Sequence, residues 1–172
     1  MKTIGITGAG SWGTALATVL AGKGHRVRIW DIDERHLRSM EEHRENVDYL
    51  PGVPLDDNIE ITYTTEAALK DADVVLFSAP AQHFREALTS ALEYIGNAAI
   101  VINVAKGIEQ KSLKRMSEIA AEHLDLDRYV VLSGPSHAEE VGRRLPTTVA
   151  AASYDLKAAE AVQDKGSLGA CP

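Results

Sequence analysis

The stretch GITGAGSWGTALA, residues 5–17, carries glycines at positions 8, 10 and 13, between an apolar run and a run of helix-forming residues. This spacing occurs both in plain tight turns and in loops that hold the phosphates of a dinucleotide. Context separates the two, because a phosphate-binding loop joins a strand to the start of a helix. The run TIGIT predicts a strand at 3–7, and residues 11–22 predict a helix. The sequence therefore favours a dinucleotide site over a purely structural turn.

Each glycine has a separate role in that interpretation. Gly8 permits the tight turn, Gly10 lets a pyrophosphate approach the backbone, and Gly13 lets the helix lie close to the strand. The amide groups at the start of the helix then face the phosphates.

The remainder of the chain predicts an α/β fold, because apolar runs rich in β-forming residues alternate with segments of helical periodicity. These runs are 3–7, 26–30, 59–64, 73–79, 98–105 and 129–133. The central runs are apolar on both faces, which is typical of a mostly parallel sheet covered by helices on each side. A Rossmann-type, doubly wound sheet with strand order 3-2-1-4-5-6 is the leading topology, and a flavodoxin-like order is the alternative.

The length of 172 residues predicts one domain, which we place at 1–164 as an NAD(P)-binding Rossmann domain. Residues 44–58 show neither the helical nor the strand periodicity of apolar residues, so they predict a long loop or lid. A helix is expected over 155–164, and residues 165–172 are expected to be a disordered or foreign tail.

The composition of the chain limits the kinds of molecule that it is expected to bind and the compartment in which it is expected to lie. Lys and Arg number 18 against 25 Asp and Glu, a net charge of −7 that disfavours nucleic acid. The chain contains neither a membrane-spanning run nor a signal peptide, so a cytoplasmic protein is expected. The single cysteine, Cys171, fits a reducing compartment and is expected to be an inert thiol.

Asp31 ends the second predicted strand, eighteen residues after Gly13. A carboxylate at this position accepts hydrogen bonds from the adenosine ribose and repels a 2′-phosphate. NAD is therefore expected in preference to NADP. Arg35 and Arg38, on the following helix, could still receive the extra phosphate of NADP, or could form a solvated helix face.

Ligands of such sheets bind beyond the carboxyl ends of the strands, where the chain has SAPAQHF (78–84), NVAKGIE (103–109) and SGPSHAEE (133–140). Lys106 stands at one of these ends, where an ammonium could contact a substrate phosphate or polarise a carbonyl; a solvated surface lysine is the alternative. Ser136 is expected to cap a helix over 137–144, with Glu139 completing a capping box.

Two histidines, His83 and His137, also follow strands and could act as acid or base, although hydrated loop histidines are common and neither has an evident carboxylate partner. The other histidines lack metal-ligand spacing, so no metal site is expected. These are His25, His36, His43 and His123.

Four segments together resemble the bacterial NAD(P)-dependent glycerol-3-phosphate dehydrogenase family. They are GAGSWGTALA (8–17), NVDYLPGVPL (46–55), AKGIE (105–109) and SGPSHAEEVGRRLPTTV (133–149), and the resemblance extends over about residues 1–163. It implies an N-terminal Rossmann domain followed by a C-terminal helical domain. It also implies an oxidoreductase that interconverts dihydroxyacetone phosphate and sn-glycerol 3-phosphate for phospholipid synthesis, with a homodimer expected in full-length members.

The resemblance also implies roles for individual residues. Cofactor contacts fall on Gly8, Gly10, Ser11, Trp12, Gly13, Asp31, Phe84, Lys106 and Ala138, and substrate contacts on Lys106, Gly134 and Ser136. Lys106 supports catalysis, whereas the family's proton-donor lysine is not among these residues.

The chain departs from the family in two respects. Asp31 and Ile32 stand where many relatives place basic or polar residues that read NADP. The family also continues for about as many residues again, so we interpret this chain as a truncated cofactor half that is inactive alone. A non-catalytic dinucleotide-binding module and another two-domain dehydrogenase of hydroxy compounds are the alternatives.

Overall fold

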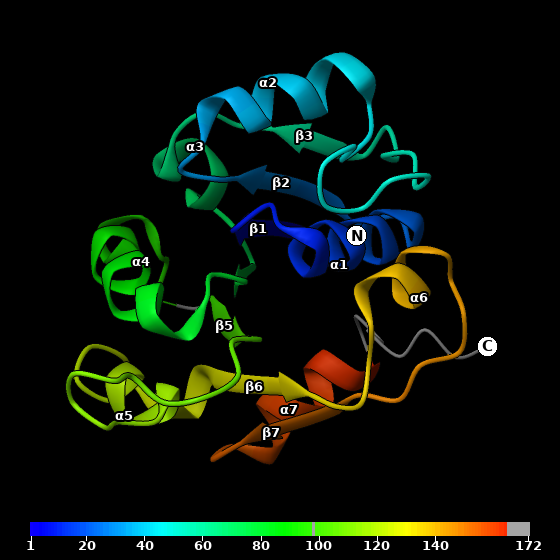
Figure 1. Ribbon diagram of the computed structural model, residues 1–172. Coiled ribbons are helices and arrows are strands. Elements are labelled where there is room, and N and C mark those ends of the chain that lie inside the picture. The colour runs from blue at the N-terminus through cyan, green and yellow to red at the C-terminus, as the bar shows by residue number, and fades with distance from the viewer. Residues whose placement is uncertain (98, 165–172) are drawn as a thin grey trace.

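The computed structural model describes residues 1–97 and 99–164, which form a sheet with helices on both faces (Figure 1). The expected tail at 165–172, including Cys171, lies outside the described residues. The strands are β1 (Thr3–Thr7), β2 (Arg26–Trp30), β3 (Ile59–Ile61), β4 (Val74–Phe77), β5 (Ile100–Asn103), β6 (Tyr129–Ser133) and β7 (Ala150–Ser153). The helices are α1 (Ser11–Gly22), α2 (Glu34–His43), α3 (Thr65–Leu69), α4 (Phe84–Ala91), α5 (Met116–Ala120), α6 (Ala138–Gly142) and α7 (Leu156–Asp164), with short 3₁₀ turns at Ala81–His83, Leu92–Tyr94 and Leu126–Arg128.

The strand order is β3-β2-β1-β4-β5-β6-β7, so the predicted order 3-2-1-4-5-6 is confirmed. All pairs are parallel except β6 with β7, an antiparallel edge strand that the sequence analysis did not predict. The central register pairs Ile4 of β1 with Val27 of β2 and with Val74 of β4. The chain leaves β1 for β2 on one side and reaches β4 on the other, which makes the carboxyl end of β1 the switch point of the sheet.

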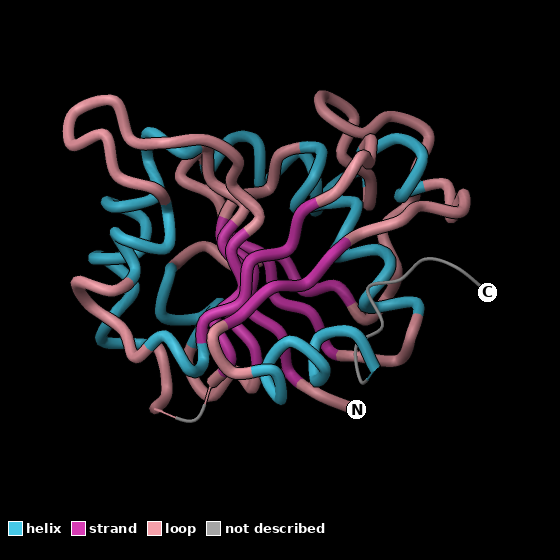
Figure 2. Tube along the Cα trace, turned by 90° about the horizontal axis from the view of Figure 1, so that it is seen from below, coloured by secondary structure: helices cyan, strands magenta, loops and turns pink. Residues whose placement is uncertain are grey.

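Two apolar layers form most of the core, one on each face of the sheet. Figure 2 shows the helices that lie on either side of the strands. One layer contains Leu16 and Leu20 of α1, Leu37 of α2 and Val162 of α7. The other is formed under α3, α4 and α5. Strands β1 and β4 are almost wholly buried, and burial on both faces explains why the β4 sequence, VVLF, is apolar without alternation.

No described helix is long and apolar enough to span a bilayer.

Residues 44–58 form a loop, as predicted, but the loop is packed against the domain and is not a free lid. Leu50 and Val53 lie in a buried cluster with Ala15 and Val19 of α1 and Val141 of α6. These loop residues are buried because they contact α1 and α6. Contacts between segments so far apart in the sequence cannot be predicted from local sequence patterns.

A charged cluster fastens α4 to the segments that flank α5. Arg85 of α4 binds both oxygens of Glu109, at 2.9 and 3.0 Å, and also pairs with Glu122, which in turn accepts from Lys114 at 2.7 Å. These bonds, first to Arg85 and then to Lys114, lower the pKa of Glu122 to about 2. The charged form of Glu122 therefore contributes to stability.

We expect this contribution to depend on pH. The folded pKa of Glu122 is below its unfolded value, so the contribution is complete above about pH 4.3 and is lost as the pH falls toward about 2. Glu122→Gln should flatten the fall in the free energy of unfolding over this range, as measured by urea unfolding at a series of pH values. Glu42→Gln, a matched change at an exposed position of α2, should leave the profile unaltered, and an unaltered Glu122→Gln profile would contradict the prediction.

Candidate dinucleotide site

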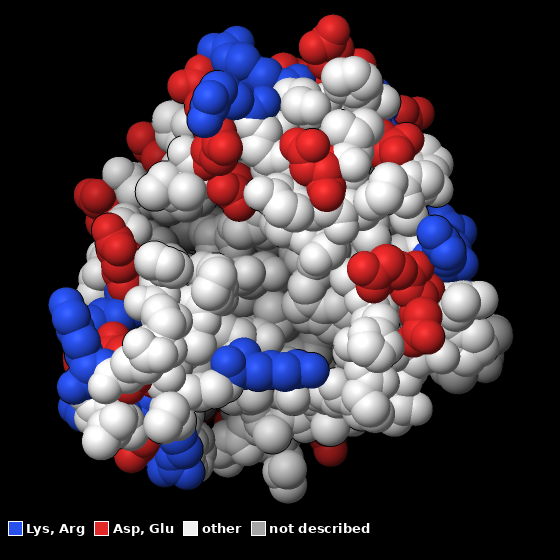
Figure 3. Space-filling model, in the orientation of Figure 1, with Lys and Arg blue, Asp and Glu red and all other residues white. Residues whose placement is uncertain are grey.

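The carboxyl edge of the sheet carries a cavity of about 440 Å³. It lies between the start of α1, the ends of β4 and β5 and the start of α6, and the hollow face of the molecule is visible in Figure 3. Its size is that of ordinary small-molecule sites. The lining residues are Ser11, Trp12, Ser78, Ala79, Pro80, Val104, Ala105, Lys106, Ser136, His137, Ala138 and Glu139.

The three glycines of the first loop are required for different reasons. Gly8 has φ +97°, and a side chain there would meet the Ser78 backbone at 2.9 Å. A Cβ at Gly13 would lie 2.0 Å from the carbonyl oxygen of Gly8. Gly10, by contrast, has an ordinary φ of −69° and nothing within 4 Å of a Cβ. The first and third glycines thus serve the fold, whereas the second leaves open space.

The start of α1 presents unpaired backbone donors to this space. Among the described residues, no hydrogen bond uses the N–H groups of Gly10, Ser11 or Trp12, and the helix has no side-chain cap. Free N–H groups and the positive end of the helix dipole together favour an anion. The loop can therefore hold a phosphate without a basic side chain.

Asp31 lies beside this loop, directly after β2. Its Oδ2 accepts the N–H of Ala9 at 2.7 Å, and its Oδ1 accepts the N–H of Asp33 at 3.1 Å. A carboxylate can accept further hydrogen bonds with its remaining lone pairs, so a ribose hydroxyl can still bind. The next side chain, Ile32, is 87% exposed.

The two arginines of α2 lie on its solvent face. Arg38 pairs with Glu34 and stacks over the Tyr63 ring at 5.4 Å. The Arg35 side chain is 95% exposed, with its Nε 3.8 Å from Asp33. Arg35 and Arg38 therefore form a solvated helix face in this structure, which is one of the two alternatives that the sequence leaves open.

Lys106 joins the ends of β5 and β6 across the cavity. Its Nζ donates to the carbonyl oxygen of Gly134 at 2.9 Å. An ammonium has three N–H donors, so two remain for a ligand. Gly134 itself must be glycine, since a Cβ there would lie 2.6 Å from the carbonyl oxygen of Thr148.

The start of α6 differs from the prediction. The capping residue is His137 and not Ser136, and no side chain caps the helix, so the expected capping box with Glu139 is wrong. The backbone enters α6 one residue later than the motif suggests, which leaves the Ser136 side chain at the cavity. His137 and Ala138 line the cavity too.

Phe84 lies apart from the other expected contact residues. Its ring is fully buried and meets the ring of Phe77 edge-on at 5.7 Å. Its N–H also bonds within the preceding turn, to Ala81. Phe84 therefore offers the cavity neither its ring nor its amide, while the nearby His83 is exposed and does not line the cavity.

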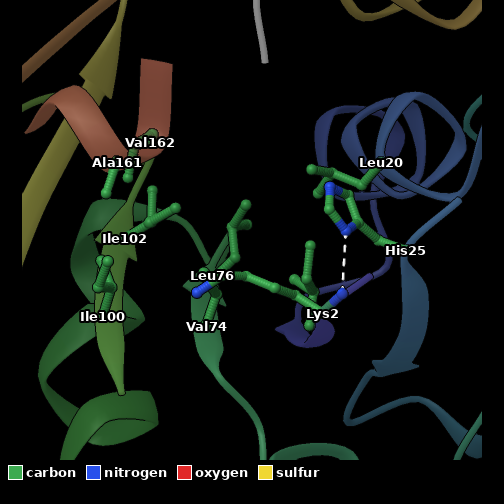
Figure 4. A pocket seen from close by; sticks show the side chains of 10 residues that line it. Lys2, Leu20, His25, Val74, Leu76, Ile100, Ile102, Ala161 and Val162 are labelled. Atoms are coloured by element: carbon green, nitrogen blue, oxygen red, sulfur yellow. Dashed lines mark hydrogen bonds between the residues drawn. The ribbon is translucent and has the colours of Figure 1, made fainter. Parts of the chain in front are cut away.

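A second cavity, at the opposite edge of the sheet, has a volume of only about 30 Å³ (Figure 4). It lies between α1 and α7 over aliphatic side chains such as Leu76 and Ile102, and its polar members include Lys2, whose N–H donates to His25 Nδ1 at 3.2 Å. Its small size and apolar floor do not suit a dinucleotide. Within residues 1–97 and 99–164, no group of three His, Cys, Asp or Glu side chains is arranged to hold a metal.

Sequence reasoning missed the buried polar residues behind the glycine loop. Asn46, His36 and Thr14 all reach the carbonyl oxygen of Ala9, at 2.9, 3.0 and 3.2 Å. Asn46 falls in the segment 46–55 that carries the family resemblance, and this was the one available signal. Its position in a loop suggested a lid instead.

Comparison with known proteins identifies the family to which the chain is similar. The sequence profile described as "NAD-dependent glycerol-3-phosphate dehydrogenase N-terminus" matches residues 3–159. The chain is 49% identical over 164 residues to a glycerol-3-phosphate dehydrogenase of Pelotomaculum thermopropionicum, covering 94% of this chain and 47% of the relative. The Bacillus subtilis relative is 47% identical over 167 residues, with 95% and 48% covered.

Solved structures of glycerol-3-phosphate dehydrogenases are also similar to this chain. The crystal structure of glycerol-3-phosphate dehydrogenase from Coxiella burnetii superposes with a TM-score of 0.88 at 33% identity, over 95% of this chain and 50% of that one. The chain thus spans about half the length of the relatives that it matches.

The different demands on Gly10 and Gly13 give a testable contrast. Gly10→Ala should fold normally, because its φ suits alanine and its Cβ enters open space, yet it should weaken NADH binding at least about tenfold, or 1.4 kcal/mol. Gly13→Ala should lower the free energy of unfolding by about 1–3 kcal/mol or more, because its Cβ meets a backbone oxygen. Thermal unfolding and NADH fluorescence titration measure the two effects. Normal NADH affinity in Gly10→Ala would show that the space above Gly10 is not the phosphate site.

Proposed function

Because this chain belongs to the NAD-dependent glycerol-3-phosphate dehydrogenase family, whose N-terminal part it matches, we propose that residues 1–164 form the dinucleotide-binding domain of such an enzyme. The proposed reaction of the whole protein is reversible hydride transfer between NAD(P)H and dihydroxyacetone phosphate, which yields sn-glycerol 3-phosphate for phospholipid synthesis. The observation that carries the proposal is the open space at Gly10 beside the unpaired N–H groups of α1.

These residues suit a dinucleotide. The N–H groups of Gly10 and Ser11 would donate to the pyrophosphate, and the absence of a side chain at position 10 would let it approach. Trp12 lines the cavity of about 440 Å³ at the carboxyl edge of the sheet. Gly8 and Gly13 would act through the shape of the loop, and Ala138 would contact the cofactor from the far wall. A bound nicotinamide supplies the hydride.

The Asp31 carboxylate would accept hydrogen bonds from the ribose hydroxyls of the adenosine. It stands beside the loop with acceptor capacity left over, and its negative charge opposes a 2′-phosphate. The side chain of the neighbouring Ile32 cannot donate a hydrogen bond to a phosphate. We therefore propose NAD as the preferred cofactor, with NADP as the weaker ligand.

Substrate contacts are assigned to Lys106, Gly134 and Ser136. The Lys106 ammonium would attract the substrate phosphate or the negative charge that develops on the reacting carbonyl oxygen. Its bond to Gly134 holds it across the cavity, and Ser136 adds a hydroxyl on the same side. Phe84 is left out of the proposed site, because its ring is buried in the core. The cytoplasmic location and the homodimer stay predictions.

The cofactor preference can be measured directly. We expect the 172-residue chain to bind NADH at least about tenfold more tightly than NADPH, a difference of 1.4 kcal/mol in binding free energy. Fluorescence titration with each reduced cofactor gives the two dissociation constants. Asp31→Asn should narrow the difference, because the amide keeps an acceptor for the Ala9 N–H but removes the charge. Tighter NADPH binding by the unaltered chain would contradict the prediction and would direct attention to Arg35.

The same chain should bind NADH without turning over dihydroxyacetone phosphate. The relatives are about twice as long as the matched stretch, and the proton donor and substrate clamp are expected from their other half. Without a general acid the rate falls by about 10²–10⁴, and lost orientation removes up to about 7–11 kcal/mol. NADH absorbance followed with millimolar substrate tests this, with the Bacillus subtilis relative as a positive control. Turnover at an ordinary enzyme rate would contradict it.

A further inference from the structure

The carbonyl group of Ala9, within the glycine loop, is held by side chains from three different parts of the chain. We propose that Asn46 and His36 are positioning residues for the dinucleotide: by fixing this carbonyl they aim the Gly10 N–H at the phosphates. The inference rests on the proposed function of the loop as the phosphate site. It assigns a role to the segment 44–58, which the proposed reaction leaves without one.

Asn46 is held in one orientation. Its Nδ2 donates to Ala9 O at 2.9 Å and to Thr14 Oγ1 at 2.8 Å, while its Oδ1 accepts the N–H of Tyr49 at 3.0 Å. A flipped amide would set oxygen against the Ala9 carbonyl, so the partners determine which atom is which. Asn46 and Thr14 are both 0% exposed, and hydrogen bonds in such a place have no competition from water.

His36 approaches the same oxygen from α2. Its Nε2 lies 3.0 Å from Ala9 O. A carbonyl oxygen can only accept, so Nε2 must carry the hydrogen. The ring packs edge-on against Tyr49, with centroids 4.9 Å apart, whereas its Nδ1 lies 3.6 Å from Asp48 Oδ2 and has no hydrogen-bond partner. Tyr49 belongs to the same loop as Asn46 and contacts both Asn46 and His36, so this loop supports both donors.

The geometry of the peptide that joins Ala9 and Gly10 links these contacts to the direction of the Gly10 N–H. In a planar trans peptide the C=O of one residue and the N–H of the next point in opposite directions. Because the Ala9 carbonyl points toward Asn46 and His36, the Gly10 N–H points away from them. Asp31 holds the other side of the residue through the Ala9 N–H. Both peptide groups of Ala9 are thus fixed.

The loop needs this support, because Ala9 lies between two glycines. Glycine adopts many backbone conformations, so Gly10 does not restrain the peptide that joins residues 9 and 10. If that peptide turned over, a carbonyl oxygen would face the phosphates in place of an N–H donor. The buried donors prevent this, because turning would leave them unpaired.

The test compares loss and restoration of the donors in the 172-residue chain. Asn46→Ala and His36→Leu should each raise the dissociation constant of NADH, by at least about tenfold for Asn46→Ala, and should shift the Gly10 amide signal in the ¹⁵N NMR spectrum of the ligand-free protein. His36→Gln, whose side-chain N–H can stand in for Nε2–H, should restore affinity to within about twofold. Asn58→Ala in the same segment and His43→Leu in α2 are matched controls at exposed positions and should change neither readout.

The outcomes are distinguishable. Folded Asn46→Ala and His36→Leu proteins with unchanged NADH affinity and an unmoved Gly10 signal would overturn the inference. A purely structural role would lower the unfolding temperature without a selective effect on NADH, and His36→Gln would then bind no better than His36→Leu. If Asn46→Ala fails to fold, the two His36 variants decide. If the unaltered chain binds no NADH, the proposed function fails, while the Gly10 signal still reports whether the carbonyl is held.

Discussion

The carbonyl oxygen of Gly8 lies 2.0 Å from the point where a side chain at position 13 would begin. This contact presses the first turn of α1 against the end of β1, and only glycine permits it. It sets the start of the helix at the switch point of the sheet, which is the carboxyl end of β1, with β2 on one side and β4 on the other. The cavity, the free N–H groups and the place of Asp31 beside the loop all follow from it.

The parts of the fold that depend on short-range patterns could be predicted from the sequence. The bounds of β1, β2 and β6 match the predicted runs, because the β-forming residues of these strands point into the core and stand out from the polar segments that flank them. The strand at Ala150–Ser153 was missed because its small residues, half of them exposed, show neither alternation nor bulk. The α6 cap was misassigned because a Ser followed by Glu three residues later is a local signal that the chain path overrode.

Contacts between distant segments could not be predicted. Asn46 is 37 residues from Ala9 and reaches it only because the loop folds back between α1 and α6. Phe84 follows a strand, like the true lining residues, but its ring turns into the core toward Phe77. An acidic chain of net charge −7 can still hold an anion in this fold, since backbone donors and Lys106 supply the attraction.

We infer that the glycine loop binds the phosphates of a nicotinamide dinucleotide through its backbone. A crystal structure of the 172-residue chain grown with saturating NADH tests it most directly. We expect pyrophosphate oxygens within about 3 Å of the Gly10 and Ser11 nitrogens, with the Ala9 carbonyl still turned toward Asn46. A dinucleotide bound elsewhere, or a pyrophosphate held by side chains with those two nitrogens left unused, would contradict it.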